Sequence, residues 1–397
     1  MNCLICSNPI SPFISFGKQP IANGFLLPDQ FKDEYFFDME VAFCSHCCMV
    51  QLTNQPDREK MFHENYAFYS SSSKHMAAHF EKFAKDVMDK YKPEFVVEIG
   101  CNDGILLKHF TCRKTGIEPS LNVADIALSN GIETIASFFD EKVAESIVDR
   151  RGQADVILSA NVMAHIPDLH SVMRGVKKLL KPEGVLIFED PYMGDILEKT
   201  SYDQIYDEHA FFFSLNSINY LVRQHGMEVV DVQHQDTHGG SMRYTVANTG
   251  KHFKTRRVIN LFMEEYFRGM EKPETYNKFN HAVESSRINL INLLTKIKSE
   301  DGNIVGYAAT AKSATVANYC GIGPDLIDYI CDTTPIKQGK FSPGAHIPVK
   351  PYQAFLDNPP THALLFAWNH TAEIMEKEKD YKGKWIVYVP EVKILES

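Results

Sequence analysis

The sequence predicts an α/β protein built from three parts, and three observations carry this prediction. Residues 1–65 are rich in Cys, Pro, Gly and Phe and contain two CxxC pairs. Residues 70–250 alternate strand-like and helical segments, the pattern of a parallel α/β sheet. A second alternation follows a helical region at 255–299, and 397 residues suffice for two or three domains at about 150 residues each. We expect domains at 1–65, 66–252 and 253–397.

The individual segments support each part in turn. In the first part, 39-MEVAF-43 is a short strand candidate. The strands of the central sheet are predicted from four apolar runs: EFVVEIG (94–100), KTGIEP (114–119), ADVILSA (154–160) and GVLIFED (184–190). Helical periodicity broken at Pro273 predicts a helical hairpin over 255–299. A second, smaller α/β unit is predicted from NIVGYAA (303–309), LIDYICD (326–332), HALLFAW (362–368) and KWIVYVP (384–390).

Composition and charge exclude several classes of partner. The formal net charge of −10 argues against nucleic acid, because phosphate binding needs a clustered basic surface. The opening MNCLICSNPI is not a secretory signal, and no apolar run is long enough to cross a bilayer. We therefore expect a cytoplasmic protein, whose nine cysteines are metal ligands, reactive thiols or core residues rather than disulfides.

The two CxxC pairs are Cys3–Cys6 and Cys44–Cys47, about forty residues apart. Thiolates three residues apart on a tight turn bind one metal ion, and two such turns complete a tetrahedral zinc site. Four cysteine ligands imply a closed, structural site, because catalytic zinc keeps a position open for water. His46 and Cys48 are neighbours that complicate the ligand assignment.

The stretch VVEIGCNDG (96–104) has the form of a cofactor loop. Gly100 permits a turn at the strand end, and Gly104 is expected to open a helix close to a ligand. Asn102 replaces the second glycine of a dinucleotide loop, while Glu98 suits a cofactor with a positively charged amino-acid tail, such as S-adenosylmethionine. Glu118, at the end of the next strand, is placed to accept hydrogen bonds from ribose hydroxyls. Further cofactor contacts are expected from Ser137, Phe138 and Asn161.

The stretch YDQIYDEHAFFF (202–213) crowds ionisable groups against an apolar run. Tyr206, Glu208 and His209 lie within four residues, and buried charges need partners, so this cluster is either an exposed loop or a site. His165 emerges at the carboxyl end of the predicted strand ADVILSA (154–160), where ligands bind in open α/β sheets. The phenylalanines are expected to wall a pocket and exclude water.

The C-terminal part carries a candidate phosphate site. GYAATAKS (306–313) resembles an ATP-binding loop in spacing, but Ala311 replaces the glycine before the lysine, which argues against ATP. Amides at a helix N-terminus together with lysines can still hold a pyrophosphate. The candidate substrate-binding residues are Gly239, Gly240, Arg243, Lys312, Ser313, Lys337 and Lys340. Arg243 is expected to act as a bidentate partner of a phosphate or a carboxylate.

Six motifs in order carry a resemblance that covers essentially the whole chain: the CxxC pair, VEIGCNDG, NVMAHIPD, DQIYDEH, HGGSMR and GYAATAKSAT. Together they resemble bacterial S-adenosylmethionine-dependent sugar C-methyltransferases that act on nucleotide-linked keto-deoxysugars. The resemblance implies a zinc-binding domain, a Rossmann-like methyltransferase domain and a C-terminal Rossmann-like domain that helps bind the sugar nucleotide without holding a dinucleotide.

The same resemblance implies roles for individual residues. His209 is expected to be the general base, with Tyr206 and Glu208 beside it and His165 across the cleft. A tyrosine of ENYAFYSSSSK also belongs to the family site, and Tyr69 is preferred to Tyr66.

The chemistry fits these residues, since a carbon beside a ketone becomes nucleophilic once a base removes its proton. The expected product is a nucleotide-linked 4-keto-deoxyhexose methylated at C3, made by a monomer or small homo-oligomer. The alternatives are a zinc-containing methyltransferase acting on RNA or DNA and a non-catalytic nucleotide-sugar binding protein.

Overall fold

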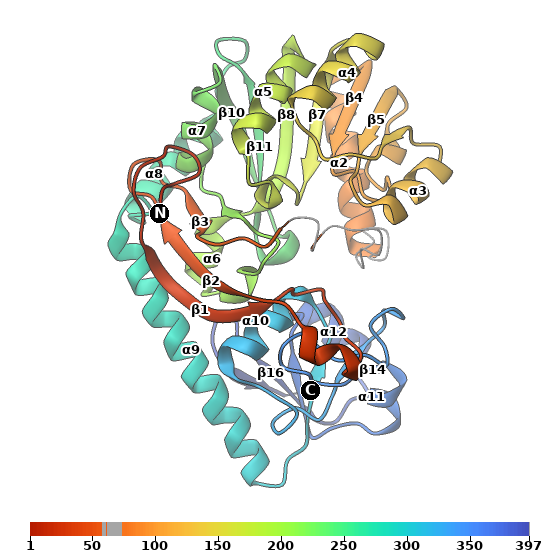
Figure 1. Ribbon diagram of the computed structural model, residues 1–397, viewed down its shortest axis with the longest axis vertical. Helices are drawn as coiled ribbons and strands as arrows, with labels where there is room; N and C mark the ends of the chain where they lie inside the picture. The colour runs from red at the N-terminus through yellow and green to blue at the C-terminus, as the bar shows by residue number, and fades with distance from the viewer. Residues whose placement is uncertain (58–60, 62–73, 397) are drawn as a thin grey trace.

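The computed structural model describes residues 1–57, 61 and 74–396. Its central and C-terminal sheets lie at opposite ends of the molecule, with the N-terminal strands between them (Figure 1). This arrangement gathers segments from all three parts of the chain around the middle of the molecule.

The central sheet has the strand order β10-β11-β8-β7-β4-β5-β6. Its parallel strands are β4 (Phe95–Ile99), β5 (Arg113–Ile117), β6 (Thr134–Ile135), β7 (Ala154–Ala160) and β8 (Leu180–Pro191). Two antiparallel strands, β10 (Met227–Gln235) and β11 (Ser241–Asn248), extend the sheet beyond β8. Because β4 pairs with β5 on one side and β7 on the other, the strand order reverses at β4, where such sheets bind ligands.

The helices of the central part are α2 (Lys74–Tyr91), α3 (Leu121–Ser129), α4 (Glu141–Arg151), α5 (Leu169–Leu179), α6 (Met193–Lys199) and α7 (Leu215–Arg223). In α5 the buried positions Leu169, Val172, Met173 and Val176 recur every three or four residues, so one face packs on the sheet. Asp140 caps α4 and Asp168 caps α5, each accepting a backbone N–H three residues on.

The N-terminal sheet is completed by a strand from the central part. Its own strands are β1 (Pro12–Pro20), β2 (Phe36–Phe43) and β3 (Val50–Leu52), with a short 3-10 helix η1 (Pro28–Asp33) between the first two. The fourth strand, β9 (Phe211–Phe212), pairs antiparallel with β3. The phenylalanine run therefore joins the N-terminal sheet to the stretch that carries His209.

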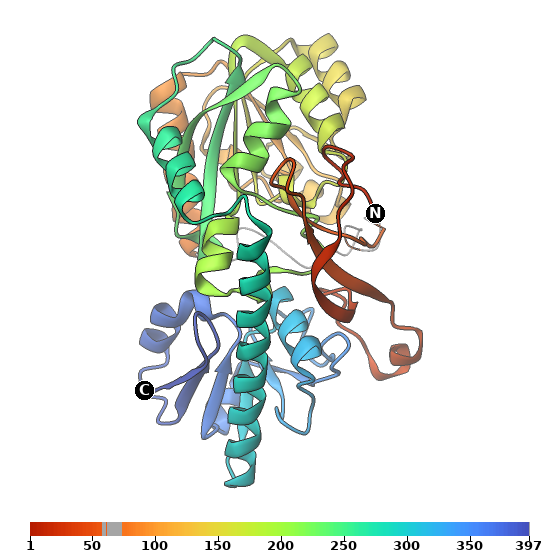
Figure 2. The same ribbon diagram turned by 90° about the vertical axis from the view of Figure 1, so that its left-hand side faces the viewer.

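The predicted helical hairpin is present as α8 (Arg256–Phe267) and α9 (Pro273–Ser299). Pro273 is the first residue of α9, a position where its missing N–H costs nothing. Figure 2 shows α9 as a long helix running down the molecule toward the C-terminal sheet. Strand β1 packs against both α9 and α10.

The C-terminal sheet has the order β14-β13-β12-β15-β16-β17. Its elements in chain order are β12 (Ile304–Tyr307), α10 (Ala311–Cys320), β13 (Ile330–Asp332), β14 (Val349–Pro351), α11 (Gln353–Asp357), β15 (His362–Leu365), η7 (Trp368–His370), α12 (Thr371–Lys377), β16 (Lys384–Val387) and β17 (Lys393–Leu395). All pairs are parallel except β16–β17.

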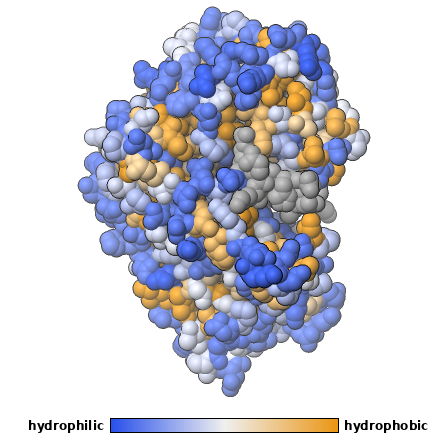
Figure 3. Space-filling view, viewed as in Figure 1, coloured by the Kyte–Doolittle hydropathy of each residue, from blue (hydrophilic) through white to orange (hydrophobic). Residues whose placement is uncertain are grey.

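Among the described residues, no helix has the length and apolar character needed to cross a membrane. On the face shown in Figure 3, hydrophobic residues form separate patches between hydrophilic ones.

Candidate active site

His209 is buried in a form suited to accept a proton. A short 3-10 helix, η5 (Tyr202–Gln204), leads into a turn in which the His209 N–H donates to the Tyr206 carbonyl at 3.1 Å. His209 Nδ1 lies 2.7 Å from the Gln204 carbonyl oxygen. A carbonyl only accepts, so Nδ1 carries the hydrogen and Nε2 keeps a lone pair. Burial, reinforced by His165, holds the pKa of His209 well below its ordinary value, so the ring is neutral.

Two aromatic rings flank this histidine. The Tyr206 ring centroid lies 4.2 Å from that of His209, and the His165 centroid lies 5.1 Å from it. His165 ends the 3-10 helix η4 (Met163–His165), which follows the carboxyl end of β7. Burial, and secondarily His238, lowers the pKa of His165 to about 4. Figure 1 shows this edge of the central sheet facing the C-terminal part.

The acidic residues beside His209 are held by the N-terminal part. The Ala22 N–H donates to Asp207 Oδ1 at 3.1 Å, and Asn23 Nδ2 donates to Glu208 Oε1 at 2.7 Å. Burial, and then the neighbouring Glu208, raises the pKa of Asp207 well above its ordinary value. The expected alternative of an exposed loop is therefore wrong, because Tyr202–His209 is largely buried and bonded to other segments.

The cofactor loop follows β4 as predicted, with one difference. Gly100 and Gly104 have φ of +71° and +79°, and a Cβ at Gly100 would collide with Val162. No α-helix opens at Gly104, contrary to the sequence prediction; turns lead to the 3-10 helix η3 (Leu107–His109). Asn102 has a left-handed φ of +48°, and its N–H donates to Glu118 Oε2 at 3.1 Å.

The carboxylates at this loop fit a cationic ligand. Glu98 is 3% exposed, and its Oε2 is buried without a hydrogen-bond partner among the residues that the structure describes. Burial, and then the nearby Asp103 and Glu118, raises the pKa of Glu98 well above its ordinary value. A positively charged amino group would relieve this penalty, so the loop fits the amino-acid end of S-adenosylmethionine.

The remaining predicted cofactor residues lie along the same edge of the central sheet. Ser137 and Phe138 directly follow β6, and Asn161 directly follows β7. Asn161 has a φ of +57°, and its N–H donates to the Glu189 carbonyl at 2.7 Å. The structure thus brings the predicted cofactor residues to the carboxyl ends of β4 to β7.

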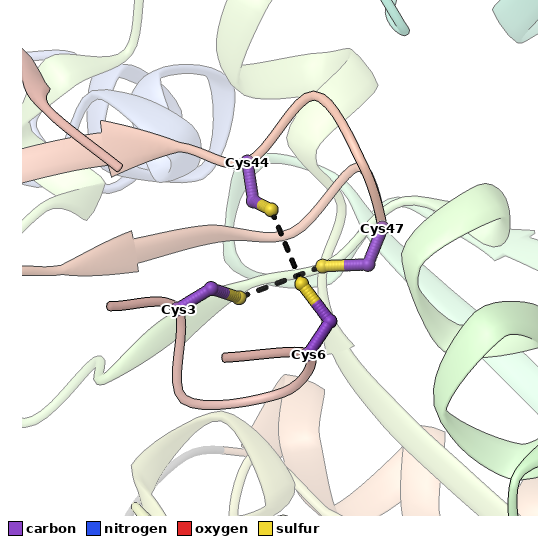
Figure 4. A group of neighbouring side chains, drawn as sticks. All are labelled: Cys3, Cys6, Cys44 and Cys47. Atoms are coloured by element: carbon purple, nitrogen blue, oxygen red, sulfur yellow. Dashed lines mark hydrogen bonds between the residues drawn. The ribbon is translucent and has the colours of Figure 1, made fainter. Parts of the chain in front are cut away.

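The four cysteines of the CxxC pairs converge (Figure 4). Cys3 Sγ lies 3.5 Å from Cys47 Sγ and Cys6 Sγ lies 3.4 Å from Cys44 Sγ, while all four sulfurs lie within 4.8 Å of one another. A zinc ion with Zn–S bonds of about 2.3 Å needs sulfurs roughly 3.8 Å apart, so this donor set fits zinc. Neither of the neighbours His46 and Cys48 belongs to the cluster.

Two lysines from the C-terminal part reach the same region. Lys312, in the first turn of α10, has its Nζ 3.2 Å from the His238 carbonyl and 3.4 Å from Asn369 Oδ1. Lys337 donates to the Ala309 carbonyl at 2.8 Å. Burial lowers the pKa of both lysines, and the nearby carboxylates, Asp203 for Lys312 and Asp332 for Lys337, oppose this lowering. Lys340 is half-buried on the same loop as Lys337, and its carbonyl accepts the Val349 N–H.

Four predicted substrate residues have other partners. The Arg243 guanidinium on β11 pairs with the Glu189 carboxylate on the neighbouring strand β8 and stacks on the Phe83 ring. Its N–H donors are therefore engaged within the protein and are not available for bidentate binding of a phosphate. Ser313 uses its hydroxyl to donate to the Thr310 carbonyl at 2.6 Å.

Gly239 and Gly240 adjoin side chains rather than an open cleft. A Cβ on Gly239 would meet Trp368 at 2.5 Å, and one on Gly240 would meet Asp195. Tyr66 and Tyr69 lie outside the described residues.

Several residues at this site escaped the sequence analysis. His238 has a left-handed φ of +55° and a buried Nε2, and its carbonyl accepts from Lys312 and Gln204. His238 belongs to the HGGSMR motif, but only the two glycines and the arginine of that motif were predicted to bind the substrate. The Trp368 indole donates to the buried Asp203 carboxylate at 2.6 Å. The sequence feature that could have pointed to Trp368 is its rarity, because the chain has only two tryptophans. Asn23 carried no local signal.

Three family models match the chain in order. A "Putative zinc binding domain" covers residues 3–62, a "Methyltransferase domain" covers 72–232 and a "C-methyltransferase C-terminal domain" covers 236–390. The C-methyltransferase NovU of Streptomyces niveus is 32% identical over 97% of this chain and 94% of its own length. The ubiquinone biosynthesis O-methyltransferase of Escherichia fergusonii is 35% identical over 23% of this chain and 41% of that enzyme.

Solved structures of lower similarity include an S-adenosylmethionine-dependent methyltransferase of Thermotoga maritima, described as a possible histamine N-methyltransferase. It is 20% identical, with a TM-score of 0.32 over 43% of this chain and 88% of that one. The plantazolicin methyltransferase BpumL is 16% identical, with a TM-score of 0.34 over 43% and 82%. Because the similarity to NovU spans nearly the whole chain, the protein belongs to the S-adenosylmethionine-dependent C-methyltransferases that carry an N-terminal zinc-binding domain.

Proposed function

We propose that the protein methylates C3 of a nucleotide-linked 4-keto-deoxyhexose, with His209 as the general base. The observation that carries the proposal is the state of His209: a buried, neutral ring whose Nδ1–H is fixed on the Gln204 carbonyl, leaving Nε2 as the proton acceptor. General bases work best when the unprotonated form is present and positioned, and burial supplies the first of these conditions here.

In the proposed reaction, His209 Nε2 takes the proton from the carbon next to the ketone, and the C–H electron pair moves into an enolate. Tyr206 is suited to donate a hydrogen bond to the enolate oxygen. Burial, and then Glu208 and Asp207, raises the pKa of Tyr206 well above its ordinary value, so the phenol keeps its proton. Glu208, held by Asn23, orients this arrangement, and His165 closes its other side.

We assign the cofactor to the edge of the central sheet. Glu98 faces its amino-acid end, Glu118 its ribose, and the turn around Asn102 brings the backbone close to it. When bound, S-adenosylmethionine would supply an electrophilic methyl group: the enolate carbon would form a C–C bond to it as the methyl–sulfur bond breaks, with S-adenosylhomocysteine as the leaving group. Ser137 and Phe138 flank the adenine.

The diphosphate of the substrate is assigned to Lys312 and Lys337, with Lys340 at the rim. Both half-buried lysines, Lys312 and Lys337, contact carbonyl oxygens, and a diphosphate would favour their charged form. Domain boundaries at 1–65, 66–252 and 253–397 and a cytoplasmic location complete the proposal.

Solvent exchange tests the base directly. With S-adenosylhomocysteine in place of the methyl donor, wild-type protein in deuterium oxide should wash deuterium into the sugar at the reacting carbon. His209→Asn should slow this exchange by roughly 10²- to 10⁴-fold, whereas the matched variant His165→Asn should retain it. If His165→Asn stops exchange while His209→Asn does not, the base is His165. Absence of both exchange and methylation with nucleotide-linked 4-keto-deoxyhexoses would refute the substrate class.

A further inference from the structure

The segment between strands β1 and β2, residues 21–35, leaves the N-terminal sheet and lies against the C-terminal part of the molecule (Figure 1). We call this segment the strap. It belongs to the zinc-binding part of the chain, and it contacts both the stretch that carries His209 and the loop 333–348 between β13 and β14. One short segment thus joins the residues beside the proposed base to the loop that carries Lys337.

The first end of the strap holds the residues that precede His209. The Ala22 N–H donates to Asp207 Oδ1, and Asn23 Nδ2 donates to Glu208 Oε1. Both acidic side chains are buried. A hydrogen bond to a buried carboxylate is among the stronger ones in proteins, so this end of the strap is firmly tied to the turn that contains the base.

Phe25 brings the strap to Lys337. Its ring is buried, and Lys337 Nζ lies 5.1 Å from the ring centre, within range of a cation–π contact. Asn23 and Phe25 are two residues apart, so their Cα atoms are separated by no more than about 7 Å. Burial lowers the pKa of Lys337, and Asp332 and then Glu208 oppose this lowering, as charges close enough to interact do. The strap therefore contacts the acidic neighbour of the base and the lysine at almost adjacent positions.

Backbone pairing fixes the register between the strap and the loop 333–348. The Leu26 N–H donates to the Phe341 carbonyl at 3.2 Å, and the Phe341 N–H donates to the Leu26 carbonyl at 2.9 Å. The Phe31 ring packs edge-on against the Phe341 ring, with centroids 5.2 Å apart. A reciprocal pair of hydrogen bonds sets both the position and the direction of two chain segments. Lys340 directly precedes Phe341 in this loop.

Glu34 supplies the polar contact at the far end of the strap. Its side chain is 5% exposed; one carboxylate oxygen accepts the Gly344 N–H and the other lies 2.7 Å from His346 Nε2. The Phe31 and His346 rings stack, with centroids 3.7 Å apart. His346 has a left-handed φ of +50°, a conformation that a non-glycine residue keeps where its surroundings hold it. Glu34 and Phe31 provide such surroundings.

We propose that the strap is a positioning element, which sets the location of Lys337 relative to His209 through Glu34 and Phe25. The inference rests on the proposed function, because it takes Lys337 as a ligand of the diphosphate and His209 as the base. It goes beyond that function by assigning the spacing between these two groups to the zinc-binding part of the chain. Glu34 and Phe25 are positioning residues, because they act through the lysine.

Hydrogen exchange tests whether the strap holds the loop. In Glu34→Ala, the amides of a peptide covering 333–348 should exchange about 10-fold faster than in the wild type, because a hydrogen bond to a charged group is lost. A peptide covering 202–209 should exchange as before, since Ala22 and Asn23 are unchanged. Asp33→Ala is the matched control: this neighbouring side chain is 79% exposed and lies 4.0 Å from Lys32.

Calorimetry with inorganic pyrophosphate tests the effect on Lys337. Glu34→Ala should weaken pyrophosphate binding about 5-fold or more and raise the KM of a nucleotide-linked substrate more than it lowers kcat. Affinity for S-adenosylhomocysteine should stay unchanged, which a general loss of structure would not allow. Glu34→Gln keeps an acceptor for the Gly344 N–H and should recover part of the pyrophosphate affinity.

Two further variants separate action through the lysine from a local effect of Glu34. Adding Glu34→Ala to Lys337→Ala should cause no further loss of pyrophosphate affinity, because both substitutions then affect the same contact. Phe25→Leu keeps an apolar side chain but removes the ring beside the ammonium, and should weaken pyrophosphate binding by about 2- to 5-fold.

Three results would overturn the inference: unchanged exchange of the loop in Glu34→Ala, faster exchange with wild-type pyrophosphate affinity and KM, or additive losses in the double variant. The proposed function fails separately. If Lys337→Ala binds pyrophosphate as the wild type does, or the wild type methylates no nucleotide-linked keto-sugar, the anion or the sugar assignment falls, while exchange of the loop in Glu34→Ala still decides whether the strap holds it.

Discussion

Arg243 provides a sharp test of the structure, because the sequence and the structure assign it different partners. Its guanidinium pairs with Glu189, whose side chain is 1% exposed, and its Cζ lies 3.7 Å from the centre of the Phe83 ring. Arg243→Met should therefore leave a buried carboxylate without its main partner. Breaking a buried pair from one side costs about 3–5 kcal/mol, and the lost cation–π contact adds roughly 0.5–2 kcal/mol.

One contact reduces this loss. His79 Nε2 lies 2.7 Å from Glu189 Oε2 and remains after the substitution. We therefore expect a loss of about 3 kcal/mol in the free energy of unfolding, measured by urea denaturation. Replacing both partners with Met should recover most of it, because apolar pairs of similar size are often as stable as buried ion pairs.

The same carboxylate predicts a pH dependence. Burial raises the pKa of Glu189, but the hydrogen bond from His79 and the charge of Arg243 outweigh burial and lower it overall. A lowered folded-state pKa stabilises the protein above the unfolded value of about 4.3, and this stability is lost as the pH falls through the folded-state pKa. The difference between wild type and Arg243→Met should accordingly shrink below about pH 4.

Arg257→Met is the matched control, because Arg257 pairs with buried Asp231 at 2.6 Å but is 55% exposed. Asp231 keeps the Thr255 hydroxyl at 2.7 Å and the Lys90 ammonium at 3.4 Å, so the loss of the exposed Arg257 partner should cost only about 1 kcal/mol. If Arg243→Met keeps its stability to within about 0.5 kcal/mol and instead raises KM, the sequence-based assignment to a substrate anion is right and the ion-pair reasoning is wrong.

Three further predictions test the zinc site, the cofactor loop and the close contact at HGGSMR. Cys44→Ser should lose stoichiometric zinc by metal analysis while Cys112→Ser, outside the cluster, keeps it; zinc retained in both would refute the ligand set. Glu118→Ala should weaken S-adenosylhomocysteine binding by about 1.5–3 kcal/mol in calorimetry, and unchanged affinity would move the ribose elsewhere. Gly240→Ala should lower the unfolding midpoint, because its φ is +130° and the new Cβ would collide with Asp195; an unchanged midpoint would contradict this packing.

The sequence predicted the parallel strands better than the antiparallel ones. ADVILSA coincides with β7, and the other three central runs overlap β4, β5 and β8. Strands buried on both faces read as continuous apolar runs, which makes them visible locally. β10 and β11 were not predicted, and the pairing of β9 with β3 joins residues about 160 apart, which no local pattern can reveal.

The residues of the candidate site show the same difference: local spacing was informative, and contacts between distant residues were not predicted. The spacing of three residues allowed Tyr206 and His209 to share a face in a helical turn and Tyr206 and Glu208 to share one in a strand; the structure has the turn, with the His209 N–H on the Tyr206 carbonyl. Arg243 was expected to bind a phosphate or a carboxylate of the substrate, and its partner is a carboxylate of the protein itself: Glu189 is its direct cross-strand neighbour only once β11 pairs with β8. The N-terminal contacts of Asp207 and Glu208, each 185 residues distant, were equally beyond a local pattern.

Those distant contacts explain why three parts are needed around one histidine. The stretch 202–209 is held from the N-terminal side by the Ala22 N–H on Asp207 and from the C-terminal side by Thr315, whose hydroxyl donates to the Ile205 carbonyl at 2.7 Å. Asp203 accepts from Trp368 and from Tyr388 at 2.8 Å.

If His209 is the base, as proposed, a shift of this stretch by about an ångström would move Nε2 away from the reacting carbon and slow the reaction. The zinc site stabilises the part that supplies Ala22, and the C-terminal sheet supplies Trp368 and Tyr388. On the proposed mechanism the metal would therefore act indirectly, by stabilising the part of the chain whose Ala22 N–H holds Asp207 next to His209, because its four sulfur ligands leave no place for a substrate.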